Sequence, residues 1–158
     1  MDEMENLIAH STEERSLYKN ILPIVESGGF ELIRIKIFDE SHLTLQIMID
    51  NSIRPLNVDD CARISRNISY ELDTQDFFDK EYHLEVSSPG LNRPLTRLKD
   101  FDKWKGHKAM VKQKVKDLGI NKLEGTLIGL VNSELQVLQN DKIHQIKVSN
   151  IKEAKLLA

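Results

Sequence analysis

A twelve-residue stretch at residues 84–95, LEVSSPGLNRPL, constrains the backbone more tightly than any other part of the chain. Its first three residues are typical of the end of a strand, and Ser88-Pro89-Gly90 then predicts a turn. Proline fixes its own φ and moves Ser88 out of the helical region, while Gly90 can adopt a positive φ at no steric cost. We therefore expect this stretch to end one domain and to form the elbow that leads to the next.

The part of the chain before this stretch shows a mixed helical and strand pattern. Apolar residues alternate with polar ones at residues 30–38, 43–50 and 82–86, which is typical of half-buried strands. Apolar residues at helical spacing precede the first strand and separate the second from the third. The resulting order is α-β-β-α-β. We expect residues 1–95 to form an N-terminal two-layer α/β sandwich, KH-like in its order, with both helices on one face of the sheet.

Capping signals predict where both helices begin. Ser11 and Glu14 have the spacing of a capping box, and Asn57 is followed by acidic residues that suit the positive end of a second helix. Pro23 is expected to kink the first helix or to break one of its hydrogen bonds. In the second helix, Val58 begins an apolar stripe that should face the sheet.

Beyond the elbow the pattern changes to short strands. Thr96 can cap a short helix at residues 97–105, in which Leu98 and Phe101 would pack inward. Five short strands then follow in roughly 50 residues, which is typical of a small β-barrel of the SH3-like or Sm-like kind. The predicted fold class is therefore α+β, with a C-terminal barrel after the N-terminal sandwich.

The two predicted domains, residues 1–95 and 96–158, differ in charge. The first has 9 Lys and Arg against 18 Asp and Glu, a net −9, and the second has 13 against 7, a net +6. The basic domain could approach a polyanion or an acidic protein, whereas the acidic domain should be repelled by phosphate and could attract a basic protein. Two ordinary solvated faces of opposite sign are the alternative explanation of this charge difference.

Between the two domains, residues 87–106 would serve as elbow and short linking helix, with Trp104 filling the joint.

The cysteine content and the apolar runs of the sequence indicate the cellular compartment. Cys61 is the only cysteine, so no intrachain disulfide can form, which suits a reducing compartment. The longest apolar runs are far shorter than a membrane span, and the acidic start of the chain lacks the basic region of a signal peptide. We therefore expect a cytoplasmic protein that does not enter a membrane.

No sequence motif for catalysis, metal binding or cofactor binding is found. A Gly-rich phosphate motif, Gly-x-Ser-x-Gly and His-Glu-x-x-His are all absent, and the five histidines are scattered. The carboxylates at Asp59-Asp60 suit helix capping, and those at residues 76–81 suit a solvated loop. A small hydrolase using Ser87 or Cys61 is one alternative, although Ser87 has no general base near it in the sequence. We expect no catalytic residue, no metal and no cofactor.

One cationic group stands out in the second domain. Lys108, Lys112 and Lys114 share strand parity, so they should project from one face of the first barrel strand. Such charges contact phosphates and position a protein on RNA without reading its sequence. An ordinary Lys-rich edge strand that resists aggregation explains them equally well. Aromatic residues make up only 6% of the chain, which disfavours free single-stranded RNA as a ligand.

Residues 84–95 also resemble the signature of the bacterial ribosome maturation factor RimP family. The match consists of Leu84, Glu85, Val86, Ser87, Ser88, Pro89, Gly90, Leu91, Arg93, Pro94 and Leu95. Asn92 stands where an aspartate is common, which is a mild departure. The order of elements along the rest of the chain also follows the family. The resemblance implies a non-enzymatic, two-domain assembly factor in which an α/β domain precedes an Sm-like barrel.

The resemblance further implies a factor required for late assembly of the small (30S) ribosomal subunit. Such a factor binds the free or immature subunit, including its rRNA, and assists incorporation of the decoding-centre ribosomal protein. We expect a monomer in the free form. Arg93, presented from the rigid turn, would either pair with a carboxylate across the domain joint or reach RNA phosphate. A generic RNA-binding or transcription-linked adaptor is the alternative, although a KH-like Gly-x-x-Gly loop is absent.

Overall fold

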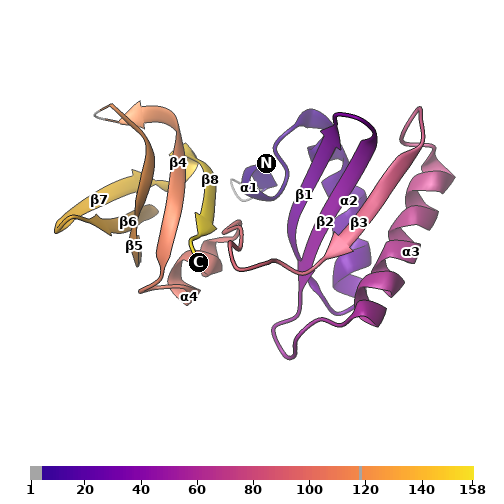
Figure 1. Cartoon of the computed structure of the whole chain (residues 1–158), viewed down its shortest axis with the longest axis horizontal. Helices are drawn as coiled ribbons and strands as arrows, with labels where there is room; N and C mark the ends of the chain where they lie inside the picture. Colours follow the sequence, from indigo (N-terminus) through magenta and orange to yellow (C-terminus); the bar gives the residue numbers. More distant parts are fainter. Residues whose placement is uncertain (1–4, 118) are drawn as a thin grey trace. The chain divides into compact units, whose positions relative to one another are not determined.

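The computed structural model describes residues 5–117 and 119–158, which divide into two compact units (Figure 1). The first unit is Ile8–Pro89. The second unit is Gly90–Ala158, joined by Leu7 from the short helix α1 (Glu5–Ile8). The division therefore falls between Pro89 and Gly90, whereas the sequence led us to expect it after Leu95. The hydrogen bonds of the elbow explain this difference, as described below.

The first unit has the predicted α-β-β-α-β order. Its elements are α2 (Thr12–Ser27), β1 (Glu31–Asp39), β2 (Leu43–Asp50), α3 (Val58–Gln75) and β3 (Tyr82–Ser87). The sheet order is β1-β2-β3, with β2 antiparallel to β1 and parallel to β3. Because a parallel pair needs a crossover connection, α3 links β2 to β3, and it lies with α2 on one face of the sheet (Figure 1). The mixed α and β fold predicted here is confirmed.

Both helices begin at the predicted capping residues. In α2, the Ser11 hydroxyl accepts a hydrogen bond from Glu14 N at 3.1 Å, and the Glu14 carboxylate accepts one from Ser11 N at 2.9 Å. In α3, Asn57 and Asp60 form the same reciprocal pair, at 2.8 and 3.1 Å. Helix α2 continues through Pro23, so the proline does not end the helix and removes only its own N–H from the helical hydrogen bonds.

The core of the first unit lies between the two helices and the inner face of the sheet. Its central residues, each at most 1% exposed, are Leu17, Ile21, Val25, Ile35, Leu45, Ile47, Ile64, Ile68 and Leu72. Val58 is 83% exposed, so the prediction that it begins the apolar stripe of α3 is wrong. Val58 precedes Ile64 by six residues, which places the two side chains about 120° apart around the helix axis.

Glu14 also connects α2 to the outer edge of β1. Its Oε2 accepts a hydrogen bond from Ile37 N at 2.8 Å, and its Oε1 accepts from the backbone N–H groups of His10 and Ser11. Burial raises the pKa of Glu14, but the backbone donors at Ser11, Ile37 and His10 outweigh it and hold that pKa below its usual 4.5. The carboxylate therefore covers part of an otherwise open strand edge.

The second unit contains one short helix and one antiparallel sheet. Its elements are α4 (Leu98–Lys103), β4 (Lys108–Asp117), β5 (Ile120–Val131), β6 (Glu134–Gln139), β7 (Lys142–Lys147), the 3₁₀ turn η1 (Val148–Asn150) and β8 (Ile151–Leu156). The sheet order is β7-β6-β5-β4-β8 (Figure 1). The five predicted strands are confirmed. The closed barrel is not confirmed, because within the described residues the hydrogen-bonded order ends at β7 and at β8 without joining them.

The linking helix α4 is shorter than the predicted helix at residues 97–105. It begins after Arg97 rather than after Thr96, and its start is capped by the Asp100 carboxylate, which accepts a hydrogen bond from Arg97 N at 3.1 Å. Phe101 is fully buried, as predicted, but Leu98 is 47% exposed, so its predicted inward packing is wrong. Because α4 has fewer than two turns, Leu98 lies at the end of the helix, and of the two predicted apolar residues Phe101 alone reaches the core.

Replacing Glu14 with Gln should destabilise the first unit. We expect the free energy of unfolding at pH 7 to fall by about 1–3 kcal/mol, because charge-assisted hydrogen bonds to three backbone N–H groups are weakened. The folded-state pKa lies below the unfolded-state value, so this contribution is complete above the usual pKa of 4.5 and is lost as the pH falls through the folded-state pKa. The difference between wild type and variant should therefore narrow at low pH.

Denaturant titrations at pH 7 and pH 3 measure this effect. Glu13→Gln is the matched control, because Glu13 is an exposed residue in the first turn of the same helix. Equal destabilisation by both variants, or a difference that is independent of pH, would contradict the role given to Glu14.

Candidate functional site

The elbow (residues 87–95) ends as a short strand added to the edge of β8. Leu95 N donates a hydrogen bond to Ala154 O at 2.8 Å, and Leu156 N donates one to Arg93 O at 2.9 Å. Pro94 forms an antiparallel bridge with Lys155 between these two bonds. Residues 93–95 therefore belong to the second unit, which is why the division between the units precedes them.

The position of Pro94 in this pairing suits its chemistry. Proline has no backbone N–H, so it is tolerated in a sheet only where no ladder hydrogen bond is required from it. Pro94 and Lys155 face each other at a position where neither residue donates to the other, and both flanking hydrogen bonds come from their neighbours. The Arg-Pro step thus allows strand pairing without an unpaired donor.

Arg93 lies inside the second unit. Its side chain is 8% exposed, and its guanidinium carbon lies 5.6 Å from the centre of the Trp104 ring. Trp104 in turn packs partly buried against the core that contains Leu95 and Phe101. These contacts favour a role for Arg93 in holding the elbow to its unit over a role in contacting RNA phosphate.

A buried carboxylate fixes the chain between the elbow and α4. Asp100 is fully buried, and its Oδ2 accepts hydrogen bonds from Thr96 N and Arg97 N, each at 3.1 Å. The Arg97 guanidinium pairs with Asp100 Oδ1 at 2.8 Å, which compensates the buried charge. This network orders residues that the sequence suggested only as a helix start.

The residues considered for nucleophilic catalysis lack a catalytic arrangement in the described part of the chain. The side chains of Ser87 and Ser88 form no hydrogen bond there with an imidazole or a carboxylate. Burial, followed by the charge of Asp60, raises the pKa of the Cys61 thiol, which disfavours the reactive thiolate. No group of three His, Cys, Asp or Glu residues that could hold a metal ion occurs among the described residues.

The three predicted lysines on β4 differ in their surroundings. Lys108 and Lys114 are exposed, and Lys112 is half-buried. Lys112 Nζ lies 3.8 Å from a carboxylate oxygen of Glu153 on β8, so its charge is partly compensated. Neither Lys108 nor Lys114 has an acidic partner within the described residues. Of the three predicted lysines, Lys108 and Lys114 are therefore available to an external anion, and Lys116, further along the same strand, is also exposed.

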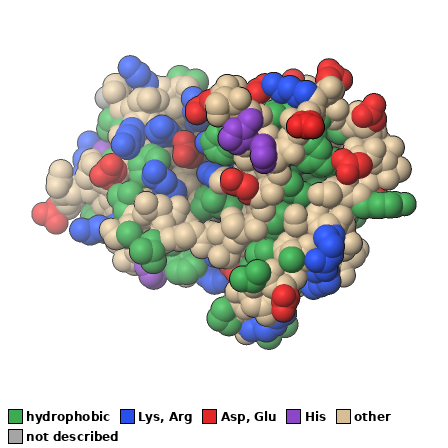
Figure 2. Space-filling view, turned by 45° about the vertical axis from the view of Figure 1, so that its right-hand side comes forward, with side chains coloured by type: hydrophobic (Ala, Val, Ile, Leu, Met, Phe, Trp, Pro, Cys, Tyr) green, Lys and Arg blue, Asp and Glu red, His purple; other side chains and the backbone are tan. Residues whose placement is uncertain are grey.

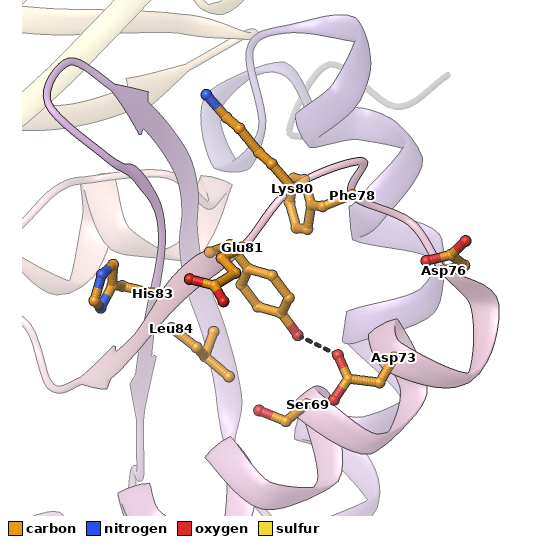
Figure 3. Close-up of a pocket in the computed structure, with 9 residues that line it drawn as sticks. Ser69, Asp73, Asp76, Phe78, Lys80, Glu81, His83 and Leu84 are labelled. Carbon is orange, nitrogen blue, oxygen red and sulfur yellow. Dashed lines mark hydrogen bonds between the residues drawn. The ribbon is translucent and has the colours of Figure 1, made fainter.

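An acidic cavity lies beside β3 in the first unit, where α3 ends and β3 begins. It measures about 540 Å³ and is lined by Ser69, Asp73, Asp76, Phe78, Lys80, Glu81, Tyr82, His83 and Leu84. The Lys80 side chain extends away from the carboxylates of Asp73 and Glu81 (Figure 3). The sequence was interpreted here as a solvated loop, and the signal that could have indicated the cavity is the Phe77-Phe78 pair within acidic residues.

Tyr82 connects the strand to the helix across this cavity. Its hydroxyl donates a hydrogen bond to Asp73 Oδ1 at 3.1 Å (Figure 3). Burial, followed by this hydrogen bond and the charge of Asp73, raises the pKa of Tyr82, so the phenol stays neutral at physiological pH. Its ring also packs against Phe78, with ring centroids 4.8 Å apart. The cavity therefore has an aromatic wall and carboxylates at its rim.

The two units carry opposite charge. Ile8–Pro89 has 8 Lys and Arg against 15 Asp and Glu, a net −7, and Gly90–Ala158 has 14 against 7, a net +7. Acidic side chains gather over the first unit at the upper right of Figure 2. No helix in the described residues is long and apolar enough to cross a membrane. The two units thus offer chemically different surfaces.

Replacing Arg93 with Ala should destabilise the second unit by about 1–2 kcal/mol, because the variant loses the contact with Trp104 and the packing of a buried side chain. Denaturant unfolding followed by the fluorescence of Trp104, the only tryptophan, measures this loss. Arg66→Ala, at an exposed position on α3, is the control and should leave stability unchanged. Wild-type stability of Arg93→Ala would contradict the structural role.

Part of the chain matches a known protein-family model. Residues 20–92 match the model described as the RimP N-terminal domain. The matched region runs from within α2 to the elbow, so it includes the three-stranded sheet, α3 and the acidic cavity. The first unit is therefore similar to the N-terminal domain of the RimP family of ribosome maturation factors.

Proposed function

We propose that this protein acts in late assembly of the small (30S) ribosomal subunit. It binds the free or immature subunit and assists incorporation of the decoding-centre ribosomal protein. The observation that carries this proposal is the match of residues 20–92 to the RimP N-terminal domain. The charge difference along the chain supports it, because residues 8–89, with a net charge of −7, are repelled by bare phosphate and residues 90–158, with a net charge of +7, are attracted to it.

The second unit provides the RNA contact in this proposal. In this proposal its five-stranded sheet is the counterpart of the family's Sm-like barrel. Strand β4 presents Lys108 and Lys114, which have no acidic partner among the described residues. These charges position the protein on rRNA phosphates, whereas Lys112 contributes less because Glu153 lies 3.8 Å from it. The protein works as a monomer without cofactor or turnover. It favours one conformation of the immature subunit and leaves when that site is filled.

Co-sedimentation with free small subunits, whole ribosomes and naked rRNA tests the proposal. We expect preferential binding to free small subunits and weaker binding as salt rises, because bound phosphates release counterions. Equal binding to naked rRNA would favour the generic RNA-binding adaptor instead. Absence of binding to all three would overturn the proposed function.

The double variant Lys108→Ala/Lys114→Ala tests the RNA contact itself. We expect the slope of log affinity against log salt to become shallower by about 2, since each lost phosphate contact changes it by about 1. Lys142→Ala/Lys147→Ala is the matched control, because it removes two exposed lysines from β7 of the same unit. Equal effects of both pairs would show that net charge alone, and not the β4 surface, determines the affinity.

A further inference from the structure

We propose that the open edge of β3, together with the acidic cavity beside it, binds an extended Lys- and Arg-rich segment of a partner protein as an added strand. This surface lies in the first unit, and it is separate from the lysines of β4 that contact RNA in the proposed function. The inference therefore goes beyond that function and depends on different residues.

The β3 strand has one free side. It pairs with β2 alone, in parallel register from Leu43 opposite Tyr82 to Met48 opposite Ser87. Within the described residues no strand pairs with its other side. Along such an edge, the outward-facing N–H and C=O groups have no ladder partner and are a ready template for an extended peptide.

Two other strand edges in the described residues are partly covered, which sets β3 apart. The Glu14 carboxylate accepts a hydrogen bond from Ile37 N on the outer side of β1, and residues 93–95 pair with β8. The remaining edge strand, β7, has a lysine at each end, which is a common protection against edge pairing and would repel a cationic segment. Among the strands that the structure describes, β3 alone combines an open edge with acidic surroundings.

The cavity beside this edge suits a long cationic side chain. Leu84, Phe78 and the Tyr82 ring provide apolar surface, and the carboxylates of Asp73 and Glu81 lie nearby (Figure 3). Lysine and arginine side chains bury an aliphatic stem and keep the charged head at a polar rim, so they match this arrangement. Asp73 uses one oxygen to accept the Tyr82 hydroxyl and retains the other for a ligand.

Charge complementarity selects the occupant. Three carboxylates line the cavity, at Asp73, Asp76 and Glu81. The cavity has a single lysine, Lys80, whose ammonium is already held by both carboxylate oxygens of Asp39, at 2.9 and 3.0 Å. This surface therefore repels nucleic-acid phosphate and attracts cations. The free strand edge also offers unpaired backbone N–H and C=O groups. A basic protein segment can bind both these groups and the carboxylates of the cavity.

Peptide titration of the full-length protein, followed by NMR, tests this proposal. The probe is an eight-residue peptide that alternates Lys and Val, with blocked termini. We expect shifts of the backbone amides of residues 82–87 and slower hydrogen exchange of the outward-facing amides of β3, because added-strand pairing protects them. A peptide of the same sequence with alternate amides N-methylated cannot pair in this way and should bind at least about tenfold more weakly.

Isosteric neutralisation of the rim tests the role of charge. Asp73→Asn/Glu81→Gln should weaken peptide binding by about tenfold, because two carboxylates at the cavity lose their charge. Glu13→Gln/Glu26→Gln changes the net charge by the same amount at exposed positions on α2 and should keep the wild-type affinity.

Three results would overturn the proposal: equal binding of the N-methylated peptide, equal loss in both double variants, or peptide-induced shifts confined to other elements. Oligouridine shifting the same β3 amides would assign the surface to RNA instead of a basic protein segment. Because the readout is peptide binding to β3, this test can fail while binding to small subunits persists, and the reverse can also occur.

Discussion

The backbone pairing of residues 93–95 with β8 is the constraint on which the division of the molecule depends. Two hydrogen bonds, from Leu95 N to Ala154 O and from Leu156 N to Arg93 O, make the end of the elbow part of the second unit. They cover an edge that would otherwise be open, and they allow Arg93 to stack on Trp104. The division between the two oppositely charged units then falls at the Pro89-Gly90 step before them. The predicted turn at Ser88-Pro89-Gly90 is not found, since these residues have no turn assignment and Gly90 does not adopt a positive φ.

Local signals in the sequence predicted much of the fold, and contacts distant in the chain account for what they missed. The capping pair of Ser11 and Glu14 was predictable because both residues lie within one helical turn. The hydrogen bond from Ile37 N to the Glu14 carboxylate was not predictable, because 23 residues separate Ile37 from Glu14. The elbow strand was missed for the same reason, because its partner β8 lies near the end of the chain. No local pattern contains such pairings.

The candidate surfaces were also predictable only where they depend on residues close together in the sequence. The alternation of Lys108, Lys112 and Lys114 was readable from strand periodicity, but the partial compensation of Lys112 by Glu153 depends on the pairing of β4 with β8. The cavity beside β3 appears only when the end of α3 and the start of β3 come together. One unit thus has exposed cations, and the other has carboxylates beside an open strand edge. The two proposals assign these surfaces to two chemically different partners.

Cross-linking of the protein to free small subunits, followed by mass spectrometry, tests this central claim most directly. We expect ultraviolet cross-links to rRNA to concentrate in the Gly90–Ala158 unit, around Lys108 and Lys114, because this unit has a net charge of +7. Carbodiimide cross-links to lysines of a partner protein should concentrate at Asp73 and Glu81. Cross-links to rRNA centred on the Ile8–Pro89 unit would contradict the separation of partners by charge.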